Sequence, residues 1–151
     1  KIDNVEAKGI IDTYFAKYKR VKEFMEELKE LASKQEYVET MHGRKVFLPN
    51  ISHSNFQVRS AAERTAINAP IQGTAADIIK IAMINIKEWL IRENIHNVFM
   101  IMQVHDELVF EIEDSDIHRY GDKISDLMGS AEKLRVPLLV NTFSGSNWQE
   151  T

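Results

Sequence analysis

Hydrophobic positions in the first third of the chain recur with the period of an α-helix. They are spaced alternately four and three residues apart, which places them on one stripe: Tyr14, Tyr18, Val21, Met25, Leu28 and Ala32. Charged residues fill much of the opposite side, as is typical of a helix with a core-facing stripe and a solvated face. The pattern therefore predicts a single amphipathic helix in this region.

A β-hairpin is predicted next. Residues 37–40 (YVET) and 45–48 (KVFL) are rich in β-branched and aromatic side chains, and Gly43 lies in the short segment between them. Glycine reaches positive φ without a steric penalty, which suits a tight hairpin turn. Pro49 and Asn50 then end the second strand.

Pro70 separates two helical stretches, residues 54–69 and a second one that ends near Glu93. Because proline lacks an N–H group and crowds the preceding turn, we expect a kink or break there. Thr74, with Asp77 three residues later, resembles a capping box that starts the second helix. The isoleucine-rich sequence of this second helix predicts that it is largely buried.

A second β-hairpin is predicted between residues 98 and 113. A nearly continuous apolar run (VFMIM) and a segment that begins apolar and then alternates (LVFEIE) flank a polar group. This order places His105, Asp106 and Glu107 near the turn of the hairpin.

The last third predicts one more helix and one more strand. Acidic residues at 114 and 116 favour a helix start, because carboxylates interact favourably with the N-terminal end of the helix dipole, and we expect this helix to end near Gly129. Residues 136–143 predict a last strand. Helices and hairpins in this order, without repeats or linkers, predict an α+β fold with an antiparallel sheet and helices packed on one face.

Composition excludes several classes of protein. The 151 residues include no cysteine, which excludes disulfides, thiolate metal sites and thiol nucleophiles. No apolar run approaches the ~20 residues of a membrane helix, so we expect no membrane partner. The net charge is −4, and residues 105–151 alone carry −6, so the overall charge does not indicate a nucleic-acid partner. Phosphate-binding loops, nucleophile elbows and zincin helices are also missing from the sequence.

His105, Asp106 and Glu107 form the first group that could carry chemistry. Two adjacent carboxylates at a hairpin tip, supported by apolar strands on both sides, offer oxygen ligands to a hard cation. Mg²⁺ is typically held by one or two carboxylates together with substrate phosphates. The plainer alternative is an ordinary polar turn, and spacing alone favours that alternative.

Arg64, Asn68 and Gln72 form the second group. They are four residues apart, so the first two share a helix face and the third lies nearby. All three can donate hydrogen bonds, and this donor set suits the acceptors in the minor groove of a duplex. The alternative is a solvated helix face with Arg64 lying over apolar neighbours.

Two spans together resemble the C-terminal part of the family A DNA polymerases, the bacterial DNA polymerase I type. They are residues 62–77 (AERTAINAPIQGTAAD) and 103–111 (QVHDELVFE). The first is similar to the helix that follows the fingers and lies along the primer–template, and the second to motif C of the palm. Residues 37–49 (YVETMHGRKVFLP) and 136–148 (VPLLVNTFSGSNW) match family patterns in the right order. The resemblance thus covers nearly the whole chain.

This resemblance implies roles for the hairpin tip. Asp106 is similar to the motif C carboxylate that binds the catalytic metal pair, with Glu107 in a supporting role. His105 is similar to the neighbouring residue that contacts the primer strand near its 3′ end. The implied sheet is of the palm type.

The residues similar to the family's minor-groove contacts near the primer terminus are Arg64, Asn68 and Gln72. The implied reaction is template-directed nucleotidyl transfer from a deoxynucleoside triphosphate to the 3′-hydroxyl of a primer on primer–template DNA. Two Mg²⁺ ions are the implied cofactors, and no protein nucleophile is needed. The implied setting is DNA replication and repair in the bacterial cytoplasm, in association with the nucleoid.

The family's other metal-binding aspartate, in motif A, and the fingers helix precede the region that this chain resembles. We therefore expect residues 1–151 to be the C-terminal part of a larger polymerase domain, either excised or one member of a split enzyme. The first residue, which is not Met, agrees with this expectation. We expect the chain to be inactive without its missing N-terminal part.

Two alternatives remain open. The chain could be a non-catalytic nucleic-acid-binding α+β module, in which Asp106 would not matter. It could also be an interaction protein in which the motifs are coincidental, and it would then lack any salt-sensitive affinity for DNA.

Overall fold

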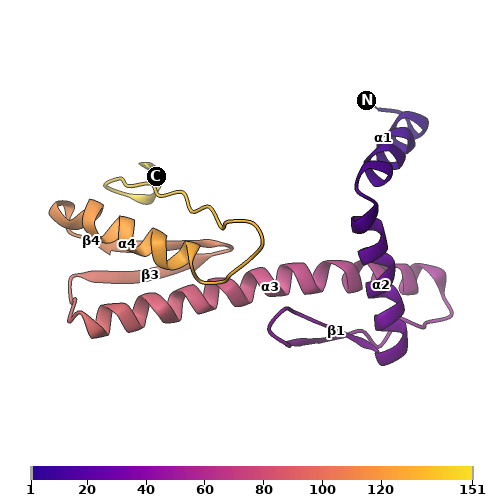
Figure 1. The fold of residues 1–151 in the computed structure, drawn as a ribbon, viewed down its shortest axis with the longest axis horizontal. Helices are drawn as coiled ribbons and strands as arrows, with labels where there is room; N and C mark the ends of the chain where they lie inside the picture. Colours follow the sequence, from indigo (N-terminus) through magenta and orange to yellow (C-terminus); the bar gives the residue numbers. More distant parts are fainter. Residues whose placement is uncertain (1, 151) are drawn as a thin grey trace. The chain divides into compact units, whose positions relative to one another are not determined.

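α-Helices and two β-hairpins make up most of the described chain (Figure 1). The computed structural model describes residues 2–150, so Lys1 and Thr151, the ends of the predicted 1–151 domain, lie outside it. In chain order the elements are α1 (Asn4–Lys17), α2 (Lys19–Gln35), β1 (Tyr37–Glu39), β2 (Lys45–Phe47), α3 (Phe56–Arg92), β3 (Val98–Val104), β4 (Glu107–Ile112), η1 (Asp114–Asp116), α4 (Ile117–Gly129) and η2 (Trp148–Glu150). They form two units, residues 1–74 and 75–151, each with its own core. Within residues 2–150, no helix combines the length and apolarity needed to span a bilayer.

The predicted single N-terminal helix is two helices in the structure, because the chain turns at Tyr18 (φ −112°, ψ 60°). Leu28 and Ala32 at the end of the predicted stripe are buried, whereas Tyr14 and Tyr18 are 48% and 46% exposed. A helix stripe is buried only where another element packs on it, and the core of the first unit contains no residue of α1. The stripe is therefore confirmed for the end of α2 and wrong for α1.

The core of the first unit lies where α2, the first hairpin and the beginning of α3 meet. Its buried residues are Leu28, Ala32, Val38, Leu48, Ile51, Ala62 and Ala66. β1 and β2 pair antiparallel, with Val38 opposite Val46, and Gly43 in their turn has a φ of +78°. The predicted hairpin and its glycine turn are confirmed.

α3 runs through Pro70 without interruption, so the predicted break is wrong. A proline inside a helix removes one hydrogen bond and costs about 3 kcal/mol. Burial of Ala62 and Ala66 before Pro70 and of Ile79 after it favours continuation of the helix despite this cost. Thr74 lies inside α3, where its hydroxyl donates a 2.6 Å hydrogen bond to the Pro70 carbonyl oxygen. It therefore does not cap a second helix as predicted.

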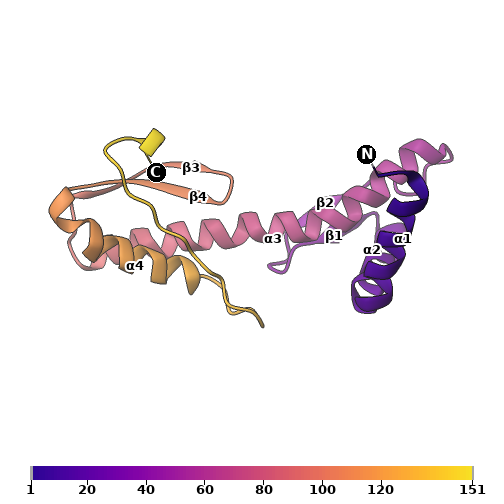
Figure 2. The ribbon, with the colours of Figure 1, turned by 90° about the horizontal axis from the view of Figure 1, so that it is seen from above.

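In the second unit, one face of the β3–β4 hairpin packs against the end of α3 and against α4 (Figure 2). The buried residues of this core are Ile86, Trp89, Leu90, Val98, Tyr120 and Ile124. The described residues leave the opposite face of the hairpin uncovered, and Phe99 and Ile101 there are 54% and 58% exposed. The predicted α+β class, with helices on one face of an antiparallel sheet, is confirmed, although the structure has two separate two-stranded sheets.

Residues 136–143 do not form the predicted strand. β3 and β4 pair only with each other, so this segment has no strand with which to share backbone hydrogen bonds among the described residues. It passes the end of α4 instead, where the Leu138 carbonyl oxygen lies 3.2 Å from the position that a Cβ on Gly129 would occupy. Leu139 and Phe143 are largely exposed.

Ile86 and Ile84 provide a test of the second core. The second half of α3, which the sequence predicts to be largely buried, is buried on one side only: Ile86 is fully buried, whereas Ile84 is 57% exposed. We expect Ile86→Ala to lower the free energy of unfolding by about 2–5 kcal/mol, because it leaves a cavity. Ile84→Ala is expected to change it by less than about 0.5 kcal/mol. Urea unfolding followed by circular dichroism measures both, and equal effects would contradict the assigned core.

Candidate functional site

The β3–β4 turn presents the group of His105, Asp106 and Glu107 at the tip of the hairpin. β3 ends at Val104 and β4 begins at Glu107, and these two residues pair with each other. His105 and Asp106 are therefore the two turn residues, and the side chains of the whole group are exposed. The predicted position near the turn is confirmed.

The backbone at His105 adopts the left-handed conformation, with φ of +54°. Residues other than glycine adopt it at a cost of roughly 1–2 kcal/mol, although histidine is found there more often than most. The Gln103 side chain holds the turn, because its Nε2 donates a 3.0 Å hydrogen bond to the His105 carbonyl oxygen. The tip is therefore a strained turn braced by its own strand.

A β-bulge lies within β3, with its extra residue, Ile101, four positions before His105. The register changes from Met100 opposite Phe110 to Met102 opposite Val109, so Ile101 between them has no direct partner. Such a bulge exchanges the faces of the residues that follow it, and bulges are frequent beside active sites. The sequence did not reveal it, because the unbroken apolar run of β3 carries no alternation from which a register shift can be read.

The donor chemistry of the tip fits a hard divalent cation. Asp106 and Glu107 are adjacent exposed carboxylates, and no hydrogen bond or ion pair engages their side chains within residues 2–150. In the described part of the chain, no group of three or more histidine, cysteine or acidic side chains has the arrangement to hold a metal ion by itself, so the tip offers two carboxylates and not a complete set of ligands. Mg²⁺ suits such a site, because it retains water and shares its remaining positions with substrate phosphates.

The second candidate group lies on α3 in the first unit. Arg64, Asn68 and Gln72 are all exposed, and the Arg64 guanidinium donates a 3.0 Å hydrogen bond to the Ser60 hydroxyl. At about 100° per residue, the three positions span a narrow sector of the helix, and the buried Ala66 lies on the other side. The structure thus gathers these three side chains on one face, here called the donor face, and gathers the three tip residues at one turn.

Sequence reasoning missed a contact between the first hairpin and α3. The Met41 N–H donates a 2.9 Å hydrogen bond to the Thr74 hydroxyl, and Gly73 lies against Thr40. The available signal was a glycine inside a helical pattern, which often has a packing reason. The pattern was interpreted as a helix break instead.

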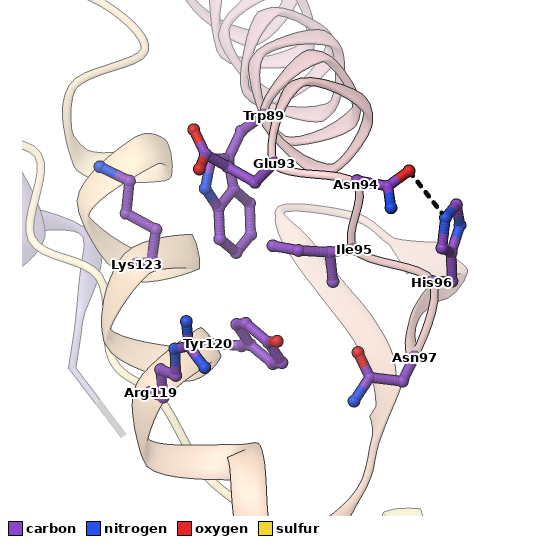
Figure 3. A pocket seen from close by; sticks show the side chains of 9 residues that line it. All are labelled: Trp89, Glu93, Asn94, Ile95, His96, Asn97, Arg119, Tyr120 and Lys123. Carbon is purple, nitrogen blue, oxygen red and sulfur yellow. Dashed lines mark hydrogen bonds between the residues drawn. The ribbon is translucent and has the colours of Figure 1, made fainter.

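A pocket of 360 Å³ opens at the C-terminal end of α3 in the second unit (Figure 3). The rings of Trp89 and Tyr120, with centroids 6.0 Å apart, lie at its base. The residues that line it carry charges of both signs, among them Glu93 directly after α3 and Lys123 on α4. None of the candidate residues lines this pocket.

The chain belongs to DNA polymerase family A, whose family model matches residues 1–150. It is 46% identical to DNA polymerase I of Pseudomonas aeruginosa over 149 residues, which are 99% of this chain and 16% of that protein. It is 42% identical to DNA polymerase I of Streptococcus pneumoniae over 149 residues, 17% of that protein. The chain therefore spans about a sixth of the length of these relatives.

A solved structure shares the fold. The POL domain of Pol1 from M. smegmatis, in complex with DNA primer-template and dNTP, superposes with a TM-score of 0.85 at 41% sequence identity. The match covers 91% of this chain and 24% of that one. The resemblance inferred from four sequence motifs is confirmed at the level of the family.

The backbone conformation at His105 makes a testable prediction. We expect His105→Val to lower the free energy of unfolding by about 1–2 kcal/mol, because a β-branched residue fits poorly at positive φ. His105→Asn should change it by less than about 0.5 kcal/mol, because asparagine tolerates this conformation. Equal stabilities of the two variants in urea unfolding would argue against the left-handed turn.

Proposed function

We propose that this chain is part of a DNA-directed DNA polymerase and supplies the motif C carboxylates and minor-groove contacts for template-directed nucleotidyl transfer. One observation carries the proposal. A chain that matches DNA polymerase I over 99% of its length presents an exposed Asp106–Glu107 pair at a hairpin turn, where its sequence resembles motif C. The relatives are bacterial, which agrees with the proposed setting at the bacterial nucleoid.

In the proposed mechanism, Asp106 is the principal metal ligand and Glu107 assists it. When bound, a pair of divalent cations stabilises the charges that develop on the attacking and leaving oxygens. The hairpin turn sets the backbone positions of Asp106 and Glu107 before the substrate arrives, which reduces the reorganisation needed during the reaction. His105 is next to them and exposed, and in this mechanism it contacts the primer strand near its 3′ end.

The donor face positions the primer–template. Arg64, Asn68 and Gln72 donate hydrogen bonds to acceptors in the minor groove, which every base pair carries there, with G·C pairs adding one donor. Such contacts hold duplexes of any sequence, as a template-directed enzyme requires. They also favour the alignment of the primer terminus, because hydrogen bonds at fixed positions sense the width of the groove.

The missing part of the polymerase domain is the proposed protein partner. The relatives are about six times longer than this chain, and the second unit leaves Phe99 and Ile101 exposed on the outer face of its hairpin. Exposed apolar patches of this kind mark surfaces that another part covers. Primer–template DNA and a deoxynucleoside triphosphate are the proposed substrates, and the M. smegmatis domain of similar fold is described in complex with both classes of ligand.

A chimaera tests the catalytic role of Asp106. In this chimaera, the chain replaces the corresponding 149 residues of Pseudomonas aeruginosa DNA polymerase I. We expect template-dependent primer extension by the chimaera and a loss of at least about 10³-fold in kcat for Asp106→Ala, because a metal ligand is removed. The chain alone should not extend a primer.

Two results would contradict this proposal. Robust extension by the isolated chain would show that no partner is needed. Unchanged activity of the Asp106→Ala chimaera, together with retained DNA binding, would favour the alternative of a non-catalytic binding module.

Arg64→Ala tests the donor face. We expect this substitution in the chimaera to weaken binding to primer–template DNA by about 1.5–3 kcal/mol, because a charged donor is lost, and to do so alike for different sequences. Arg59→Ala removes the same charge from α3, but Arg59 lies on another side of the helix, where it bonds to the His53 carbonyl oxygen. Fluorescence anisotropy with a labelled primer–template measures both affinities, and a larger effect of Arg59→Ala would contradict the assigned face.

A further inference from the structure

The turn of the first hairpin is attached to α3 by a bridging hydroxyl. The Thr74 hydroxyl donates to the Pro70 carbonyl oxygen at 2.6 Å and accepts from the Met41 N–H at 2.9 Å. The hydroxyl therefore uses its hydrogen atom as a donor and one of its two lone pairs as an acceptor. Thr65 in the same helix makes the corresponding bond to the Ala61 carbonyl oxygen at 3.1 Å, but no hydrogen bond joins its hydroxyl to the hairpin.

A close backbone approach accompanies this bridge. A Cβ on Gly73 would lie 2.6 Å from Thr40 Cγ2, which is closer than real side chains come. Thr40 is buried, and its hydroxyl accepts from the N–H groups of His42 and Arg44. Because these bonds fix its rotamer, the Thr40 methyl group cannot rotate away, and only glycine at position 73 allows the hairpin to approach this far.

The contact between the hairpin turn and α3 lies on the side of the helix opposite the donor face. At about 100° per residue, Gly73, Thr74 and Pro70 point to the side of α3 opposite the sector of Arg64, Asn68 and Gln72. The hairpin turn therefore braces the helix at the level of Gln72, one turn after the place where Pro70 cannot donate a backbone hydrogen bond to the Ala66 carbonyl oxygen. A helix that lacks this bond is less constrained around Pro70, and the bridge adds a constraint from the hairpin in the turn that follows.

We propose that Thr74 and Gly73 are positioning residues for DNA binding, which hold the hairpin turn against α3 and thereby fix Gln72 in the orientation that contacts the minor groove. The proposal rests on the proposed function of the donor face. It assigns the first hairpin a role in holding the primer–template, although its turn residues do not belong to the donor face.

A double-mutant cycle in the chimaera tests the proposal. The dissociation constant for a labelled primer–template is measured for Thr74→Val, for Gln72→Ala and for the double variant. We expect Thr74→Val to raise it about three- to ten-fold, as the loss of one hydrogen bond would. In the Gln72→Ala background, Thr74→Val should raise it less than about 1.5-fold, because the two residues act through one contact.

Three further variants separate positioning from general stability. Thr74→Ser keeps the hydroxyl and should bind primer–template like the unsubstituted chimaera. Gly73→Ala should raise the dissociation constant in the same way as Thr74→Val. Thr65→Val removes only a bond within the helix and should leave the constant unchanged. If Thr74→Val is insoluble, Thr74→Ala takes its place in the cycle, because alanine favours the helix.

The outcomes distinguish this proposal from the proposed function. If Gln72→Ala weakens binding but Thr74→Val does not, or if their effects are additive, the positioning role is wrong and the donor face stands. An equal effect of Thr65→Val would also overturn the positioning role. If Gln72→Ala has no effect on binding, the proposed role of the donor face in DNA binding is wrong. The positioning role, which depends on it, is then wrong as well.

Discussion

The packing of one face of the β3–β4 hairpin against α3 and α4 is the interaction on which the candidate site depends. A two-stranded hairpin is at best marginally stable in water by itself. The acidic tip also carries a left-handed His105, which the hairpin must hold in place. Burial of Val98 beside the Trp89 and Tyr120 rings stabilises the strands, and the strands then hold Asp106 and Glu107 at the turn. The support for the proposed metal site thus comes from a hydrophobic core that contains no residue of the tip.

α3 in the first unit likewise uses one side for core packing and the other side for candidate site residues. Small buried residues, Ala62 and Ala66, let the helix approach α2 and the first hairpin closely, and the opposite side is left to exposed donors. Pro70 and Gly73, which weaken an isolated helix, are tolerated where the hairpin turn packs against this helix. Residues that lower the local preference for a helix therefore lie where packing against the hairpin compensates for their cost.

Features set by local sequence were predictable. The Gly43 turn, the second hairpin with His105 and Asp106 at its turn, and the end of α4 at Gly129 all follow from propensities within a few residues. Features that depend on distant partners were not: Pro70 does not break α3, and residues 136–143 form no strand, because burial and strand pairing decide these cases. The two candidate groups could be chosen from the sequence because their spacing on one helix or one turn is a local property. The Thr74 bridge joins residues 33 positions apart, which no local pattern reports.

The central claim is that the hairpin tip holds a catalytic metal, and localised cleavage of the backbone tests it most directly. Fe²⁺ bound in place of Mg²⁺ in the chimaera, with ascorbate and peroxide, produces hydroxyl radicals that cut the nearest peptide bonds. Within this chain, we predict cuts at or next to Asp106 that disappear when excess Mg²⁺ is added. Cuts elsewhere in the chain but none at the tip, or cuts at the tip that Mg²⁺ does not suppress, would contradict the account.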